Sequence, residues 1–185
     1  MPAALAAAML EDVVDLAAEM PQVDGSAVVC TRPGGAATAH AVVWPGMPVL
    51  ELAADAGIAD VIAVVAARLE ASHVVVVAAD APDLPPLLVG KLFSALTGAG
   101  VAVCPAAEGG LVAVGAGVPV PAWLAGAGVD VDAPDALTLL RRHAPARSLV
   151  VGPGWHRVRS VPAALQLDPE LEGWEATRRW RDGAV

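Results

Sequence analysis

The sequence predicts an α/β protein in which helices cover both faces of a mainly parallel, twisted sheet, a three-layer α/β/α arrangement of the Rossmann-like kind. The first observation is an apolar run at 74–79, Val-Val-Val-Val-Ala-Ala, without polar alternation. Such a run, rich in β-branched residues, is typical of a central strand buried on both faces. The second observation is that helical patterns flank the run, at 58–69 and from Pro85 onward. Right-handed crossovers between parallel strands then place helices on both faces of the sheet.

Two carboxylates that end this run form the first candidate site. At the end of a central strand, Asp80 lies where ligands bind in open α/β sheets. Asp83 follows three residues later, and paired carboxylates suit a hard divalent cation that carries a nucleotide phosphate. In the alternative interpretation, Asp83 is the N-cap of the helix that Pro85-Pro86 begins. Capping and cation binding are compatible.

Apolar periodicity predicts the elements before this strand. An amphipathic helix is expected over 3–20, because apolar residues recur at helical spacing on one face and acidic residues lie on another. The apolar face holds Leu5, Met9, Val13, Leu16 and Met20, and the other holds Asp12, Asp15 and Glu19. Strands at 26–30 and 39–43 follow, separated by the turn Arg32-Pro-Gly-Gly. This turn can present amides to phosphate, but it lacks the full Walker or dinucleotide pattern, so an ordinary turn is the alternative.

The elements after the strand follow from the same patterns. The helix from Pro85-Pro86 directs Leu88, Leu92 and Leu96 toward the sheet and ends at Gly98 and Gly100. Strands at 101–104 and 111–114 are expected to form an antiparallel hairpin, followed by a helix at 134–143, a strand at 148–151 and a short strand near Val158. Asp168-Pro169 is expected to cap and open a last helix, on which Glu175 and Arg179 form an i,i+4 pair.

Composition limits the class of protein. A chain of 185 residues is most simply one domain over 1–185. The formal charge of −9 argues against nucleic-acid binding, and a nucleotide substrate would need a metal to offset the repulsion. We expect no membrane association, since no apolar stretch reaches the roughly 18 residues of a spanning helix. Cys30 and Cys104 lie in apolar runs, which predicts buried free thiols. With no secretory signal pattern, a cytoplasmic location is expected.

Further charged residues form weaker candidates. Glu108 precedes Gly109 and Gly110, where a ligand can approach the backbone closely, but an ordinary tight turn is the alternative. Three carboxylates also lie between 130 and 135, where helix capping is the alternative role. These three are Asp130, Asp132 and Asp135. The most basic region can hold one anionic group and comprises Arg141, Arg142, Arg147, Arg157 and Arg159.

Two motifs occur at a spacing that points to a family. The strand end reads Ala79-Asp80-Ala81-Pro82-Asp83-Leu84, and the later hairpin reads Glu108-Gly109-Gly110-Leu111-Val112-Ala113-Val114-Gly115. They resemble the S-D-C-P-D-L and D-G-G-Y-x-L-I-G motifs of the bacterial family called domain of unknown function 2064. The first helix is similar to that family's A-x-L-x-x-x-M-L-x-D pattern. The resemblance covers most of the chain to about residue 165.

The resemblance implies a glycosyltransferase A fold, the fold of nucleotide-diphospho-sugar transferases. Related folds serve 2-phospholactate guanylyltransferases and molybdenum-cofactor nucleotidyltransferases, so it also implies a nucleotide or nucleotide-sugar substrate with Mg²⁺ or Mn²⁺. The metal ligands implied are Asp80, Asp83 and Glu108. The resemblance also implies Gly109 and Gly110 of the hairpin motif as substrate-binding residues, while Arg157 and Arg159 are expected to bind substrate as members of the basic region.

The chain departs from the family pattern in three places. Family members begin with a strand and a basic P-G-x-x-K-T-R-L loop, whereas this chain is N-terminally short and starts at the first helix. Glu108 stands where the family has Asp, and Leu111 where it has an aromatic residue. The segment from Trp155 to Leu165 matches the family's W-x-D-V-D-T-P-E-D-L motif by position, but arginines replace its acidic residues.

Two functions are therefore expected. The first is a metal-dependent glycosyltransferase or nucleotidyltransferase in which Asp80, with Asp83 and Glu108, holds the cation that neutralises a diphosphate leaving group. The second is a noncatalytic relative that serves as a binding or scaffold module, as the missing basic loop and the arginines at 157 and 159 suggest. Without the first strand a sheet edge is exposed, and pairing of that edge with a second copy predicts a homodimer.

Overall fold

The computed structural model describes residues 1–184, and in it the chain divides into two compact units. The first unit comprises residues 1–52, 79–86 and 157–185, and the second comprises residues 53–78 and 87–156. The chain passes between the units four times, after residues 52, 78, 86 and 156. The expectation of one domain over 1–185 stays a prediction.

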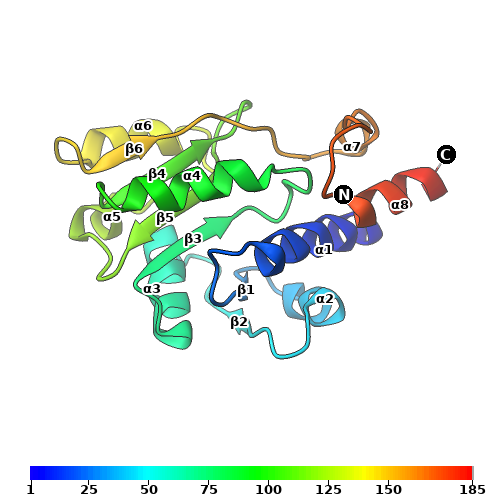
Figure 1. Cartoon of the computed structure of the whole chain (residues 1–185), viewed down its shortest axis with the longest axis horizontal. Helices are drawn as coiled ribbons and strands as arrows, with labels where there is room; N and C mark the ends of the chain where they lie inside the picture. The colour runs from blue at the N-terminus through cyan, green and yellow to red at the C-terminus, as the bar shows by residue number, and fades with distance from the viewer. Residues whose placement is uncertain (185) are drawn as a thin grey trace. The chain divides into compact units, whose positions relative to one another are not determined.

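The second unit contains a four-stranded sheet in the order β3-β5-β4-β6 (Figure 1). Its strands are β3 (His73–Val77), β4 (Val101–Pro105), β5 (Leu111–Gly117) and β6 (Leu149–Val151). Strand β5 is antiparallel to both β3 and β4, while β4 and β6 are parallel. Three of the four strands thus run in one direction, and the predicted 101–114 hairpin is confirmed.

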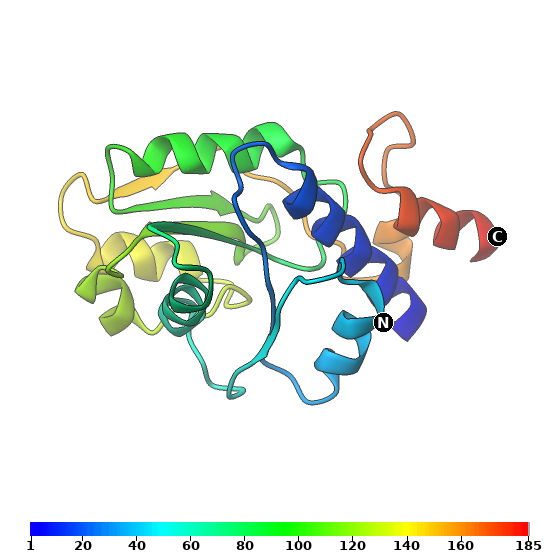
Figure 2. The same ribbon diagram turned by 60° about the horizontal axis from the view of Figure 1, so that its bottom comes forward.

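Helices lie on both faces of this sheet. Figure 2 shows α4 (Pro86–Leu96) on one face and α3 (Ile58–Leu69), α5 (Ala122–Ala127) and α6 (Ala136–His143) on the other. The apolar side of α3 is buried, as its spacing predicted. On the other face Gly115 lets α4 approach β5, because a Cβ at this position would lie 3.1 Å from Leu96 and from Val75. The layered α/β arrangement predicted from the sequence is confirmed for this unit.

The first unit contains a small parallel sheet and four helices. The sheet pairs β1 (Val28–Cys30) with β2 (Val49–Glu51), and α2 (Gly35–Val42) makes the crossover. The other helices are α1 (Ala3–Glu19), α7 (Val161–Leu165) and α8 (Glu175–Ala184). No helix within residues 1–184 combines the length and the apolar character that a membrane span requires.

Trp174 forms the centre of the apolar core in the first unit. It is fully buried in a cluster whose other members are Leu5, Met9, Val158, Ala164 and Leu167. The guanidinium groups of Arg178 and Arg181 lie 4.6 and 4.8 Å from the centroid of its ring. The Trp174 indole N–H donates to Leu171 O at 2.8 Å, which satisfies its only polar group.

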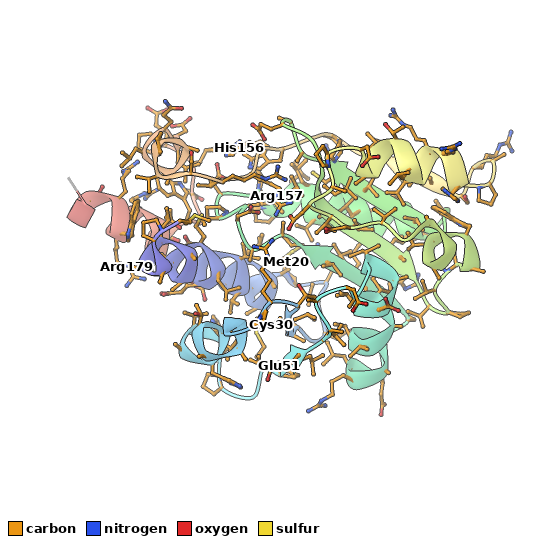
Figure 3. All side chains as sticks on the ribbon, turned by 180° about the vertical axis from the view of Figure 1, so that it is seen from behind. Met20, Cys30, Glu51, His156, Arg157 and Arg179 are labelled. Atoms are coloured by element: carbon orange, nitrogen blue, oxygen red, sulfur yellow. The ribbon has the colours of Figure 1, made fainter. Side chains whose placement is uncertain are left out.

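A buried carboxylate joins α1 to α8. Asp12 is 1% exposed, and its two oxygens accept hydrogen bonds from the backbone N–H groups of Ala176 and Thr177 at 2.8 and 2.9 Å. These N–H groups lie in the first turn of α8, so Asp12 caps that helix from 164 residues away in the sequence. Nearby, Arg179 of α8 (Figure 3) pairs with Glu11 of α1 at 2.8 Å.

Several predicted elements differ from the structure. Residues 39–43 lie in or beside α2 rather than in a strand, Val158 lies in no strand, and the last helix begins at Glu175 instead of Asp168-Pro169. Asp12 was expected on a polar face and is buried. Arg179 pairs with Glu11, and only its contact with the Glu175 carbonyl follows the predicted spacing. For Asp12 and Arg179, contacts distant in the sequence decide what local periodicity left open.

The valine-rich strand also differs from its predicted place. In the four-stranded sheet β3 is an end strand that pairs only with β5, and Val74 is its one buried residue. The strands buried along nearly their whole length are β4 and β5. Asp80 therefore follows an end strand of this sheet rather than a central one.

Burial raises the pKa of Asp12 from its ordinary 3.8 to about 6. The folded state thus keeps a proton that the unfolded state releases between these values, so this group's contribution to stability is full below pH 3.8 and is lost as the pH rises through 6. We expect the free energy of unfolding of the wild type, relative to Asp12→Asn, to fall over this window. Urea denaturation at stepped pH measures it, and a pH-independent difference between the two proteins would refute the assignment.

Candidate functional site

An ion pair fixes the turn that follows β3. Asp80 Oδ1 accepts a hydrogen bond from Arg157 Nε at 2.5 Å, and the two side chains are only 16% and 7% exposed, respectively. The backbone makes a second contact between the same segments, because Val158 N–H donates to Asp80 O at 2.6 Å. Both segments belong to the first unit. Residues 77 positions apart are thus held together by a side-chain and a main-chain bond.

Asp83 lies in the same turn and is buried, at 3% exposed. Ala81, Pro82 and Leu84 around it are buried as well, and Leu84 N–H donates to Ala81 O at 3.2 Å. Helix α4 begins three residues after Asp83, at Pro86, which agrees with the expected first-turn proline. The Asp80–Asp83 turn is therefore tightly packed.

The contacts of Asp80 do not fit a divalent cation on its Oδ1 oxygen. The lone pair that accepts from the guanidinium cannot also bind an ion, and the positive charge of the guanidinium repels a cation from this oxygen. Within residues 1–184, moreover, no group of three or more His, Cys, Asp or Glu side chains is arranged to hold a metal. The Mg²⁺ or Mn²⁺ expected at Asp80, Asp83 and Glu108 stays a prediction. The ion pair between Asp80 and Arg157 argues against it.

Glu108, Gly109 and Gly110 form the turn of the β4–β5 hairpin in the second unit. Glu108 is exposed, and both glycines have positive φ angles, 93° and 82°. Gly109 N–H donates to Ala106 O at 3.2 Å and Gly110 N–H to Pro134 O at 3.4 Å. Because both amides donate inside the protein, this geometry favours the tight-turn alternative over a phosphate-binding role.

The carboxylates between 130 and 135 lie in the loop before helix α6 (Ala136–His143). Asp130 Oδ1 accepts from Asp132 N–H at 2.9 Å, an arrangement typical of an Asx turn. Helix α6 begins at Ala136 with Asp135 as its N-cap residue, although no side-chain cap bond is made. In the capping alternative, therefore, Asp135 and not Asp130 or Asp132 holds the N-cap position, and its side chain makes no cap bond.

The predicted basic region does not form one cluster on either unit. Arg157 and Arg159 belong to the first unit, whereas Arg141, Arg142 and Arg147 belong to the second. Arg159 is exposed and Arg157 is largely buried. Arg157 therefore acts within the protein, and Arg159 is the arginine of this pair that an anionic ligand can reach.

Two residues before Arg157, the chain runs beside the end of β4. Trp155 N–H donates to Pro105 O at 3.0 Å, and Trp155 O accepts from Ala107 N–H at 2.9 Å. The half-buried Trp155 ring stacks on His156, with ring centroids 5.0 Å apart. In β4 itself, burial raises the pKa of Cys104 to about 11, so this thiol stays protonated at neutral pH and is a poor nucleophile.

Sequence reasoning found both members of the ion pair but not their contact. Asp80 was identified by its place after an apolar run, and Arg157 as an arginine where the similar family has acidic residues. The exchange of an acidic residue for a basic one is the signal that could have paired them. A basic residue at such a position can form an ion pair with an acidic residue that remains, here Asp80. No local pattern, however, pairs residues 77 positions apart.

Comparison with solved structures assigns the fold. A protein from Desulfovibrio desulfuricans G20, provisionally named a nucleotide-diphospho-sugar transferase, matches with a TM-score of 0.68 and 17% identity. The match covers 97% of this chain and 82% of that protein. The chain is thus an α/β protein with the nucleotide-diphospho-sugar transferase fold.

A family model matches residues 15–127, more than half of the chain, and its description reads "Uncharacterized protein conserved in bacteria (DUF2064)". The chain belongs to this family, which confirms the resemblance found in its motifs. Among curated proteins none matches significantly.

We expect strong energetic coupling between Asp80 and Arg157. Either Asp80→Asn or Arg157→Met breaks this largely buried ion pair and keeps one charged member, whereas the double variant removes both. A double-mutant cycle of unfolding free energies should give a coupling of about 1–3 kcal/mol. The control is the exposed pair of Glu11 and Arg179, for which we expect less than about 1 kcal/mol. Equal coupling in the two cycles would contradict a special role for the Asp80 pair.

We expect Gly109→Ala to destabilise the hairpin turn. The φ of Gly109 is +93°, and a Cβ would lie 3.2 Å from Pro134 O. Strain of this kind costs about 1–3 kcal/mol, measured by urea denaturation. The matched control is Gly98→Ala, where a Cβ meets nothing within 4 Å and a change within about 0.5 kcal/mol is expected. Equal effects of the two substitutions would show that the turn tolerates a side chain.

Proposed function

We propose that this protein binds a nucleotide-activated substrate and transfers its glycosyl or nucleotidyl group. The fold supports the proposal, since the similar Desulfovibrio desulfuricans protein is named for nucleotide-diphospho-sugar transfer. The observation that carries it is the packed turn from Asp80 to Asp83, held to the segment of Arg157 and Arg159 by a side-chain and a main-chain bond. The turn gives a rigid base on which an anionic ligand can be oriented.

Two arginines of the first unit, Arg157 and Arg159, have different roles in this proposal. The buried Arg157 neutralises Asp80 and fixes the turn. Arg159 is exposed two residues later and offers a guanidinium to a phosphate, for which its planar donors are well suited.

A noncatalytic binding or scaffold module is the second candidate, and one observation favours it. The strand-end carboxylate that would act on a cation or substrate is engaged by Arg157. If this pair never opens, the protein keeps the fold and a ligand surface without chemistry at Asp80. Binding without turnover would then be its activity.

We expect a nucleoside diphosphate or a nucleotide sugar to bind below millimolar concentration. Isothermal titration calorimetry with adenine, guanine, uracil and cytosine diphosphates and their sugar conjugates, each with Mg²⁺, with Mn²⁺ and with EDTA, measures it. Arg159→Met should weaken binding at least about tenfold, equivalent to roughly 1.4 kcal/mol. Arg141→Met removes an exposed arginine from the second unit and should leave binding unchanged.

The same panel separates the two candidates. A transferase should release nucleoside diphosphate or pyrophosphate from one donor when acceptors are supplied, whereas a binding module should leave every donor intact. If no nucleotide binds below millimolar concentration in any condition, both the transferase proposal and the nucleotide-binding form of the alternative are wrong.

A further inference from the structure

We propose that the guanidinium of Arg157 takes the place of a divalent cation at Asp80, so that this protein binds nucleoside diphosphates without metal. The inference rests on the proposed nucleotide binding, and it concerns which positive charge neutralises Asp80, since the exposed Arg159 is the arginine that meets the phosphate. Arg157 Nε is 2.5 Å from Asp80 Oδ1, and the guanidinium and carboxylate are both largely buried. An ion on the lone pair that accepts from Arg157 would lie where the guanidinium lies.

The ion pair between Arg157 and Asp80 is held in place by a backbone hydrogen bond and by the packing of the residue next to Arg157. The bond from Val158 N–H to Asp80 O, 2.6 Å long, fixes the backbone next to Arg157 against the turn that carries Asp80. Val158 itself is buried in the apolar core around Trp174. Displacing the guanidinium would leave a side chain only 7% exposed without its carboxylate, which is strongly unfavourable.

Charge balance removes the need for a metal. Asp80 and Asp83 contribute two negative charges, and Arg157 and Arg159 contribute two positive charges on the segment bonded to the turn. A site with carboxylates alone repels a diphosphate and needs a cation to bind it. Here arginines already offset the carboxylates, although the whole chain carries a formal charge of −9.

The first test measures Mn²⁺ binding directly, by the loss of the free Mn²⁺ signal in electron paramagnetic resonance. The wild type should bind no Mn²⁺ at Asp80 below about 1 mM, a weak-binding limit. Arg157→Met frees the carboxylate and should bind at least about tenfold more tightly, and Arg157→Met with Asp80→Asn should lose this gain. Arg157→Lys keeps the charge and should behave as the wild type does.

One result on the wild type overturns the inference without any Arg157 variant, which matters if Arg157→Met fails to fold. If the wild type binds Mn²⁺ below about 1 mM and Asp80→Asn removes that binding, the guanidinium does not take the cation's place. A folded Arg157→Met protein that gains no Mn²⁺ binding overturns it too, since the carboxylate then cannot serve a metal even when it is freed.

The second test compares nucleotide binding with and without metal. Adenosine, guanosine, uridine and cytidine diphosphates are titrated in EDTA and in Mg²⁺, and the best of them should bind with affinities that agree within about twofold, a difference below 0.5 kcal/mol. Binding seen only with Mg²⁺ overturns the inference and leaves the proposed function standing. Binding seen in neither condition refutes the proposed function, while the Mn²⁺ measurements still decide whether Arg157 replaces a cation.

Discussion

The first unit depends on opposite charges that meet across long separations in the sequence. Asp80 and Arg157 are 77 residues apart in the sequence, and their bond holds the two segments that carry them next to each other. The cost of desolvating two charges is offset only when their geometry is good, and the backbone bond from Val158 N–H to Asp80 O holds the two segments in that geometry. The pair therefore defines where the segment after residue 156 returns to the strand-end turn.

Asp12 also joins two segments distant in the sequence, but its carboxylate accepts backbone N–H groups instead of pairing with an opposite charge. The first turn of a helix leaves N–H groups that need an acceptor, and α8 obtains it from α1 instead of from a residue next to it. The two bonds tie the N-terminal helix to the C-terminal one, while burial makes the charged carboxylate costly and raises its pKa to about 6. The contact thus exchanges some stability at neutral pH for a fixed arrangement of α1 and α8.

The elements that could be predicted from the sequence are those whose contacts are local. The apolar face of α3 and the hairpin of β4 and β5 follow from periodicity and from a glycine turn, and both are confirmed. The short helix α2 has Gly34 before it, Gly35 as its first residue and β-branched residues within it, so its pattern also suits a strand. For β3, the valine run predicts apolar surroundings, but it does not predict which elements pack against the strand. The strand lies at the end of its sheet.

The same distinction applies to the candidate site. Residue types and spacing identified Asp80, Asp83 and the arginines near 157, because carboxylates after an apolar run and glycines at a turn are local features. What those groups can do depends on their partners: the amides of Gly109 and Gly110 donate to protein carbonyls, and Asp80 accepts from Arg157. A carboxylate bonded to a guanidinium differs chemically from a metal ligand at the same position. The fold of the chain therefore leaves the chemistry of the turn open, while this one contact neutralises Asp80 and leaves the exposed Arg159 as the positive charge that a ligand can reach.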